Sequence, residues 1–467
     1  MLREFHRKEP HRPHPRPDQE NDNLAHGTAS PLLETGDWSR RVGLFGSYLF
    51  AGFALLGITP ATVGLVLLSL SFLISFRNWR VLARDPLIII ALAFALYVTL
   101  HSLLTYLTAP IDAQAKAAID AGADWVRLLL FIPFAFWAGG RPERVRILLL
   151  LGLAGFVVGA LRKVGWTPLD AQFFTQRFEA YLPAIAFGMF SGLGALGLIA
   201  LRERFWHPGP GGVPRWLRLV SWLALLAFAL EGLMLSYSRT SWVAFAMAAA
   251  LLAYLEWRGH RAAAHPGTRI AAVLVVAISL ALLIALQHRQ IAHRLEEGGE
   301  TISKVLSGDF ADVPSDPSGL RVHALHYALD LWSQRPWLGW GAGSSRSLLM
   351  HSARPDLMLY TEKLHKKVWL RHLHNTYAEI LVQLGIIGLA LLAALLWLLA
   401  RAAALACREG RMPGDLCRFF AVSLLFVLIW NLGDYRLVRH DYNFFFIIFA
   451  GTVYSYRLRF LLEEAHG

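Results

Sequence analysis

The sequence predicts an all-α integral membrane protein with about 12 transmembrane helices, and three observations carry this prediction. Of the 467 residues, 55% are hydrophobic and only 17% are charged, and the mean hydropathy is +0.44. Apolar runs of about 17 to 25 residues, long enough to cross the hydrocarbon core of a bilayer, recur along the chain. Basic residues occupy alternate connecting segments, as they do in proteins that cross a membrane repeatedly.

Each apolar run is predicted to form one membrane-crossing helix. The predicted spans are residues 42–58, 60–76, 86–104, 125–140, 145–161, 181–201, 217–236, 240–257, 269–287, 376–400, 417–432 and 442–458. Pro60 leaves open whether the first two spans are one broken helix. The predicted regions are an arm (1–41), spans one to nine (42–287), a long loop (288–375), spans ten to twelve (376–458) and a tail (459–467).

The distribution of basic residues predicts the topology, because cytoplasmic loops retain Lys and Arg. They cluster in the arm, in alternate loops and in the tail. The clusters after the arm are Arg77/Arg80/Arg84, Arg141/Arg144/Arg146, Arg202/Arg204/Arg215/Arg218, Arg258/Arg261, Arg401/Arg408/Arg411/Arg418 and Arg457/Arg459. Both termini are therefore expected in the cytoplasm. This topology explains much of the formal net charge of +12, so nucleic-acid binding is not needed to account for it.

The amino-terminal arm and the cysteines give two further expectations. The arm, rich in Pro, His and Arg, has no compact apolar segment before a cleavage site, so we expect it to be disordered and not a signal peptide. Cys407 and Cys417 lie in a loop predicted to be cytoplasmic, where no structural disulfide is expected.

The long loop, 288–375, is polar and irregular and is predicted to lie outside the cytoplasm. Loops of this length are usually functional or disordered. Residues 321–332 are predicted to form an amphipathic helix that lays an apolar face on a membrane or on protein. The glycines of 339–343 predict a tight turn, with a phosphate cradle as the alternative.

Arginines on the outer side are informative, because the positive-inside rule gives no reason for them there. Arg239 follows a short Ser236-Tyr237-Ser238 segment, and Arg321 opens the predicted helix of the long loop. The guanidinium fork matches phosphate oxygens in bidentate geometry, so two or three arginines would neutralise a pyrophosphate. The other outer cations are Arg162, Lys163, Arg177, Arg436 and Arg439.

For each outer arginine, snorkelling to the interface or pairing with a nearby carboxylate is the structural alternative. For Arg436 and Arg439, which lie beside Asp434 and Asp441, this alternative is as strong as ligand binding.

His374 ends the long loop directly before an apolar helix, which Asn375 is placed to cap. A lone histidine at a helix start is more often structural, but imidazole is also the usual general base for a sugar hydroxyl.

A metal site is the second alternative for this region, since His365, His372 and His374 lie close together in the sequence. It is disfavoured because no Asp, Glu or Cys lies among them and the interleaved lysines and arginine would repel a cation.

Taken in order, these motifs resemble those of the bacterial O-antigen ligase and polymerase superfamily. The ordered set is Ser236-Tyr237-Ser238-Arg239, Arg321 ahead of Arg335-Pro336-Trp337-Leu338-Gly339-Trp340-Gly341, and His374-Asn375 followed by Gly385 and Gly388. The specific part of the resemblance covers roughly residues 236–390. No single motif is distinctive; the ordered set within this topology is.

The resemblance implies a GT-C-like glycosyltransferase in the inner membrane of a Gram-negative bacterium. Such an enzyme moves O-antigen from undecaprenyl pyrophosphate to a sugar hydroxyl of lipid A-core, on the periplasmic side and without a cofactor or a metal. By position, Arg239 and Arg321 correspond to pyrophosphate-binding arginines, and His374 to the essential histidine, here a general base in an inverting attack. Arg162 and Arg177 are weaker candidates for substrate binding.

Three other functions remain open. An O-antigen polymerase or a protein O-oligosaccharyltransferase would use the same donor chemistry, although the short tail after the last span disfavours the second. A transporter of a lipid-linked or anionic solute would also expose arginines in a membrane cavity, but the sequence shows no repeated halves. The ligase is favoured because a basic loop precedes His374 and could face the phosphates of lipid A.

Overall fold

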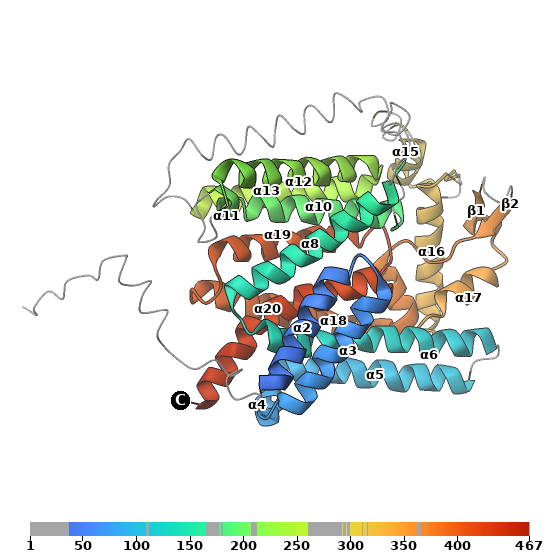
Figure 1. The fold of residues 1–467 in the computed structure, drawn as a ribbon. Coiled ribbons are helices and arrows are strands. Elements are labelled where there is room, and N and C mark those ends of the chain that lie inside the picture. Colours follow the sequence, from blue (N-terminus) through green and yellow to red (C-terminus); the bar gives the residue numbers. More distant parts are fainter. Residues whose placement is uncertain are drawn as a thin grey trace, which may run out of the picture.

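A computed structural model describes residues 37–108, 112–164, 177–178, 181–206, 213–259, 292, 296, 299–310, 312–314, 316–361 and 366–466. The expected span 269–287, residues 1–36 of the arm and His365 lie outside the described residues. Figure 1 shows long helices running side by side, with the short elements of the long loop gathered at one end of them.

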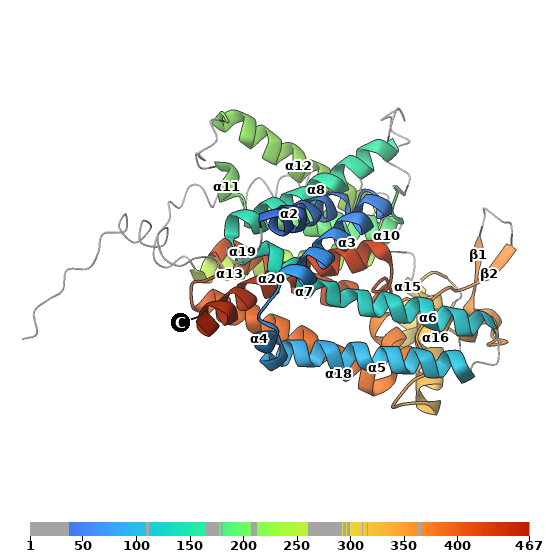
Figure 2. The ribbon, with the colours of Figure 1, turned by 60° about the horizontal axis from the view of Figure 1, so that its bottom comes forward.

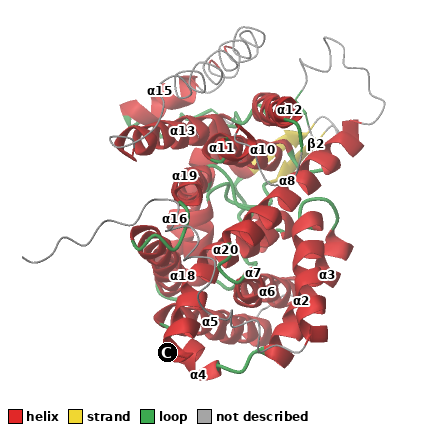
Figure 3. Ribbon diagram, turned by 60° about the vertical axis from the view of Figure 1, so that its left-hand side comes forward, coloured by secondary structure: helices red, strands yellow, loops and turns green. Residues whose placement is uncertain are grey.

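The described part of the chain is almost entirely helical, which Figure 3 shows by colour. The first half contains α2 (Asp37–Phe53), α3 (Ile58–Ser75), α4 (Trp79–Arg84), α5 (Pro86–Thr108), α6 (Asp112–Arg127), η2 (Leu128–Leu130), α7 (Phe131–Ala138), α8 (Pro142–Val164), α10 (Ala184–Ala200), α11 (Glu203–Trp206), α12 (Arg215–Leu235) and α13 (Arg239–Gly259).

The second half contains the long loop and the last three long helices. Its elements are α15 (Gly299–Ser307), α16 (Gly319–Gln334), α17 (Ser345–Met350), η3 (Pro355–Leu357), β1 (Met358–Thr361), β2 (Lys366–Trp369), α18 (Thr376–Arg408), α19 (Gly414–Trp430) and α20 (His440–His466). The two strands pair antiparallel, with Met358 opposite Trp369.

Seven of the described helices are long and apolar enough to cross a membrane. They are α3, α5, α8, α12, α13, α18 and α20. Helix α10 is also apolar but has only 17 residues. The chain is therefore a multi-pass membrane protein by the length and composition of its helices. The total of about 12 spans stays a prediction.

The first two expected spans are separate helices that pack closely on each other. Helix α2 ends at Phe53 and α3 begins at Ile58, so the chain does not continue as one broken helix through Pro60. A β-carbon at Gly46 would lie 2.7 Å from the backbone nitrogen of Leu68, so only glycine permits this approach. Helix α2 also begins at Asp37, so the last residues of the expected 1–41 arm are helical.

The expected span 125–140 is wrong as a single helix. Residues 112–138 instead form α6, the 3₁₀ turn η2 and the short helix α7. Pro133 explains the break, because proline has no N–H for the helical ladder and its ring crowds the carbonyl of the residue four positions earlier. The backbone tightens into a 3₁₀ turn at 128–130 to accommodate it.

Helix α18 is broken at Gly385, where φ is +63°. The turn predicted at 339–343 fills the break: the N–H groups of Trp340 and Gly341 donate to the carbonyls of Val382 (2.8 Å) and Gln383 (3.0 Å). Backbone groups freed by the break are thus paired with protein, as the membrane interior requires. A β-carbon at Gly385 would overlap the carbonyl oxygen of Trp337, so this glycine serves the break as well as close packing.

The carboxyl-terminal helix α20 lies at the centre of the core. Two of its aromatic rings pack edge-to-face on neighbouring helices: Phe444 on Phe50 of α2, with centroids 5.3 Å apart, and Tyr454 on Phe131 of α7, at 5.6 Å. Near its end, Arg457 forms an ion pair of 3.0 Å with the buried carboxylate of Asp85.

The expectation that the two cysteines stay unpaired is wrong: Cys407 and Cys417 form a disulfide. Helix α18 ends at Arg408 and α19 begins at Gly414, and the tight turn between them brings the two Cα atoms within 5.9 Å. This distance lies in the range that a disulfide needs.

Candidate active site

The turn between α12 and α13 is built by serine hydroxyls. The Ser236 hydroxyl accepts a hydrogen bond of 3.2 Å from the Ser238 N–H, and the Ser238 hydroxyl accepts one of 3.3 Å from the Ser241 N–H. Between them, Tyr237 has φ of +47°, a conformation that is costly for a bulky residue and tends to occur at functional sites. The turn places Arg239 at the first position of α13.

The start of α16 lies against this turn. Arg239 donates a hydrogen bond of 2.9 Å to the Ser318 hydroxyl. The Asp316 carboxylate caps the helix by accepting from the N–H groups of Ser318 (2.8 Å) and Gly319 (2.6 Å). These contacts hold the first turn of α16, and with it Arg321, beside Arg239.

Arg321 is a half-buried cation with one buried donor to spare. Its Nη1 donates to the Pro317 carbonyl at 3.2 Å, whereas its buried Nε has no hydrogen-bond partner among the described residues. Burial lowers the pKa of Arg321; the charge of Asp434 raises it, and that of Arg239 lowers it further. The two arginines that the sequence selects for pyrophosphate therefore share one electrostatic environment with Asp434.

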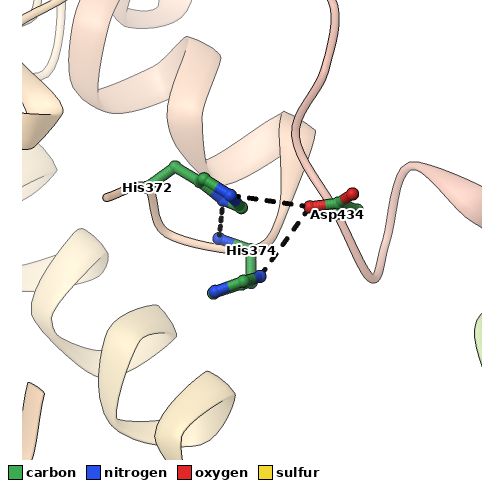
Figure 4. Close-up of side chains that lie close together, drawn as sticks. All are labelled: His372, His374 and Asp434. Atoms are coloured by element: carbon green, nitrogen blue, oxygen red, sulfur yellow. Dashed lines mark hydrogen bonds and ion pairs between the residues drawn. The ribbon is translucent and has the colours of Figure 1, made fainter. Parts of the chain in front are cut away.

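His374 directly precedes α18 and has φ of +54°. Asn375 caps the helix as predicted, since its side-chain oxygen accepts from the Ala378 N–H at 3.0 Å. His372 lies alongside, with the two imidazole centroids 4.1 Å apart. Figure 4 shows both rings turned toward the carboxylate of Asp434, which comes from the loop before α20.

Asp434 is the residue that the sequence reasoning missed as a partner of the histidines. One of its oxygens lies 3.8 Å from His372 Nε2 and 3.7 Å from His374 Nδ1. Burial by itself would raise the pKa of Asp434, but the interactions with His374 and His372 outweigh it and lower the pKa to about 2. The side chain is thus a carboxylate at any physiological pH.

Backbone contacts at the start of α18 fix the position of Asp434. The hydroxyl of Thr376 donates to the Asp434 carbonyl at 2.8 Å, and its N–H donates to the Asn431 carbonyl at 2.9 Å. The segments that carry His374 and Asp434 are therefore tied to each other.

The ring nitrogens of the two histidines have different surroundings. His372 Nδ1 accepts a hydrogen bond of 3.3 Å from the His374 N–H, which requires a neutral ring. Burial first, and then the neighbouring His374, lower the pKa of His372 to about 3, so this ring stays neutral. His374 presents Nδ1 to Asp434, and its other nitrogen points away from the carboxylate (Figure 4). The carboxylate favours the proton on Nδ1, which leaves the Nε2 lone pair available to a substrate.

A buried hydrogen-bond network fixes the backbone of the segment that carries the two histidines. The Glu379 carboxylate accepts from the Leu373 N–H at 2.6 Å and also from the Ser345 hydroxyl. Gln383 donates to Glu379 at 2.7 Å. Leu373 lies between the two histidines, so this network fixes the backbone from which both rings project.

The remaining outer arginines differ in their placement. Arg177 donates a hydrogen bond of 3.2 Å to the Ser236 carbonyl, so it lies against the turn that carries Arg239. Arg162 is exposed at the end of α8, and none of the described contacts brings it to the site. Arg436 forms an ion pair of 2.7 Å with Asp441, which confirms the structural alternative for that residue. The charge of Arg439 acts on His372.

His372, His374 and Asp434 could also hold a metal ion, since one ligand atom from each lies within 4.8 Å of the others. Asp434 supplies the carboxylate that the local sequence lacks. The charges around these three residues disfavour a metal ion. The charges of Arg239 and Asp434 both affect the pKa of Arg321, and those of Arg436 and Arg439 both affect the pKa of His372. A cluster of arginines repels a divalent cation and attracts an anion, so the site fits a phosphate-bearing ligand better.

Comparison with known proteins adds one finding. Residues 223–393 match a family model described as O-antigen ligase. The matched segment contains Arg239, Arg321 and His374 but not Asp434 or Arg177. No curated protein matches the chain.

Proposed function

We propose that this chain is an O-antigen ligase, a proposal supported by the match of residues 223–393 to the O-antigen ligase family model. It transfers O-antigen from undecaprenyl pyrophosphate to a sugar hydroxyl of lipid A-core at the periplasmic face of the inner membrane. The observation that carries the proposal is the juxtaposition of Arg239 and Arg321 with a His374–Asp434 pair. A transferase with this donor needs both: cations for the pyrophosphate and a base for the acceptor.

The first task of the site is to hold the leaving group. Arg239 and Arg321 bind the pyrophosphate oxygens, and the Nε of Arg321, which has no partner within the described part of the chain, is a donor available to them. As the bond between the anomeric carbon and the phosphate oxygen breaks, its electron pair moves onto that oxygen. The same guanidinium groups stabilise the growing negative charge.

The second task is to activate the acceptor. His374 Nε2 takes the proton of the sugar hydroxyl while the hydroxyl oxygen forms the new bond to the anomeric carbon. Asp434, 3.7 Å from Nδ1, stabilises the resulting imidazolium. Direct attack opposite the pyrophosphate inverts the anomeric configuration, and no step requires a metal.

The exposed Lys367 on β2 supports a ligase over a polymerase. It belongs to the hairpin that leads into the His374 segment, where a cation would face the phosphates of a lipid A acceptor. The preference rests on this charge, since both reactions use the same donor chemistry.

A two-acceptor assay separates these functions. Purified protein is given undecaprenyl-pyrophosphate-linked O-antigen in EDTA, with or without rough lipopolysaccharide, and the products are resolved on a gel. We expect a ladder on lipopolysaccharide and no elongation of the carrier-linked glycan. Elongated carrier-linked glycan would instead identify a polymerase. Counterflow of labelled donor without either product would identify a transporter.

A further inference from the structure

A cavity lined by both polar and apolar side chains lies away from the proposed reacting centre. It has a volume of about 710 Å³ and opens between the α5–α6 pair and the segment from Arg335 to His351. His101, Thr105 and Gln114 line one side, and Tyr327, Trp337 and Trp340 line the other. Figure 2 shows α5 and α6 side by side, reaching toward α16 and the strands.

The wall formed by the Arg335–Gly341 turn is rigid. The indole N–H of Trp340 donates to the Leu331 carbonyl at 2.8 Å, and the Arg335 guanidinium stacks over the Trp340 ring at 4.2 Å. The Tyr327 hydroxyl donates to the Leu348 carbonyl at 3.0 Å. These aromatic side chains are held in place by the protein alone, so the cavity is formed before any ligand arrives.

The opposite wall presents polar groups with unused capacity. His101 is only 8% exposed, and its Nδ1 has no hydrogen-bond partner among the described residues. Its ring is fixed by stacking on Tyr97, with centroids 5.6 Å apart. A buried polar atom without a partner is costly, and the ring that carries this one lines the cavity.

The chemistry of the lining selects the class of ligand. Amides, hydroxyls and imidazoles suit the hydroxyl groups of a sugar, and aromatic faces suit its C–H faces. A lipid chain would need a wholly apolar lining. A pyrophosphate would need more cations than Arg335, which is the one arginine among the described residues that line this cavity.

Helix α16 sets the distance from the reacting centre. Arg321 lies in its first turn, and Arg335 follows its last residue. At a rise of about 1.5 Å per residue, Tyr327 lies about 9 Å and Arg335 about 21 Å from Arg321 along this axis, so the cavity begins beyond the pyrophosphate arginines and extends away from them. Only a substrate with an extended glycan would reach both places.

We propose that this cavity is an oligosaccharide-binding subsite that holds two or three sugar units of one substrate, at a distance from the bond that is made. The proposal rests on the proposed function and deepens it. The sugars belong either to the donor O-antigen or to the core of the acceptor, which offer the same chemistry.

Binding of free oligosaccharides tests the subsite without requiring transfer. Purified protein is titrated with a lipid-free O-antigen repeat oligomer and, separately, with lipid-free core oligosaccharide, using saturation-transfer NMR and calorimetry. Trp337→Ala and Gln114→Ala remove groups from the two walls. Trp216→Ala is the matched control, because Trp216 and Trp337 are each 65% exposed and Trp216 lies outside the cavity.

We expect one of the two oligosaccharides to bind, and both cavity variants to weaken its binding at least tenfold while Trp216→Ala leaves it unchanged. Binding of the repeat oligomer would assign the subsite to the donor, and binding of core would assign it to the acceptor. No binding by wild type, or equal binding by all variants, would overturn the subsite. The transfer assay tests the proposed function independently: no transfer by wild type would contradict that function whatever the result of these binding measurements.

Discussion

In the proposed mechanism the chemistry depends on the pair Asp434 and His374, and each is held by contacts that do not involve the other's side chain. Asp434 is fixed through Thr376, and the backbone at His374 is fixed through Glu379. The distance of 3.7 Å between His374 Nδ1 and the carboxylate is longer than a hydrogen bond. Apo sites often have such loose contacts, which tighten when the substrate is bound.

Asp434→Asn should reduce the rate of transfer by about 10²-fold or more, because the amide keeps the shape of the carboxylate but cannot stabilise an imidazolium. Donor binding should change little. The control is Asp330→Asn, at an aspartate whose side chain is 51% exposed on α16. The measurement is the steady-state rate of transfer, and thermal unfolding of each variant verifies that it is folded. An Asp434→Asn protein as active as wild type would remove Asp434 from the mechanism.

Arg321→Lys should not restore the donor binding that Arg321→Gln loses, because an ammonium group cannot reproduce the bidentate contact of a guanidinium with phosphate. Both variants should weaken the binding of undecaprenyl pyrophosphate by about tenfold or more, since hydrogen bonds to charged groups contribute about 1.5 to 3 kcal/mol. Arg346→Gln, at an exposed position on α17, is the matched control. Binding of the carrier to protein in detergent is the measurement, and full affinity in Arg321→Lys would contradict the bidentate role.

His372 predicts a specific pH dependence of stability. Its pKa is lowered from 6.5 to about 3 by burial and by His374. Between those values the unfolded chain binds a proton that the folded chain excludes, so the free energy of unfolding falls as the pH falls below about 6.5. One such group contributes a slope of at most about 1.4 kcal/mol per pH unit.

Thermal unfolding of wild type and His372→Gln between pH 8 and pH 5 checks this prediction. The neutral glutamine should flatten the curve below pH 6.5 and leave it unchanged above. Parallel curves for the two proteins would show that His372 is protonated in the folded state.

At the scale of elements, the sequence predicted helices best where apolar runs are long and end in clear signals. Asn375 is the clearest example: the predicted cap is the observed one. The span 125–140 failed because apolar content hid the effect of Pro133 on the helix. The break at Gly385 could not be predicted either, because the backbone carbonyls and N–H groups that it frees are paired with backbone groups of residues 336–341, more than forty positions earlier in the chain.

Gly385→Ala should destabilise the protein, because the residue would need φ of +63° and its β-carbon would overlap the Trp337 carbonyl. Left-handed backbone alone costs a non-glycine residue about 1 to 3 kcal/mol. Gly152→Ala, in α8, is the control, since among the described residues the nearest atom to its β-carbon would be the Ala51 carbonyl oxygen of α2 at 3.8 Å. The melting temperature in detergent should fall for Gly385→Ala and stay level or rise for Gly152→Ala. Equal melting temperatures would mean that the break is not required.

On the scale of the whole molecule, the sequence predicted a multi-pass helical protein, and the structure confirms it with seven helices of sufficient length and apolarity. The site was predicted only in part. Arg239, Arg321 and His374 could be chosen because they belong to an ordered set of motifs. Asp434 could not, because 60 positions separate it from His374 and only the fold brings them together. The disulfide between Cys407 and Cys417 was not predicted either, because the cytoplasmic location predicted for their loop was given more weight than their short spacing in the sequence.

In the proposed mechanism His374 is the base of a metal-independent glycan transfer. The most direct test compares wild type, His374→Ala and the exposed-histidine control His326→Ala in EDTA, with equal binding of undecaprenyl pyrophosphate established first. We predict laddered lipopolysaccharide from wild type and from His326→Ala, and none from His374→Ala despite unchanged donor binding. Transfer by His374→Ala at the wild-type rate would contradict the role of His374 as the base. Loss of transfer by wild type in EDTA would contradict metal independence.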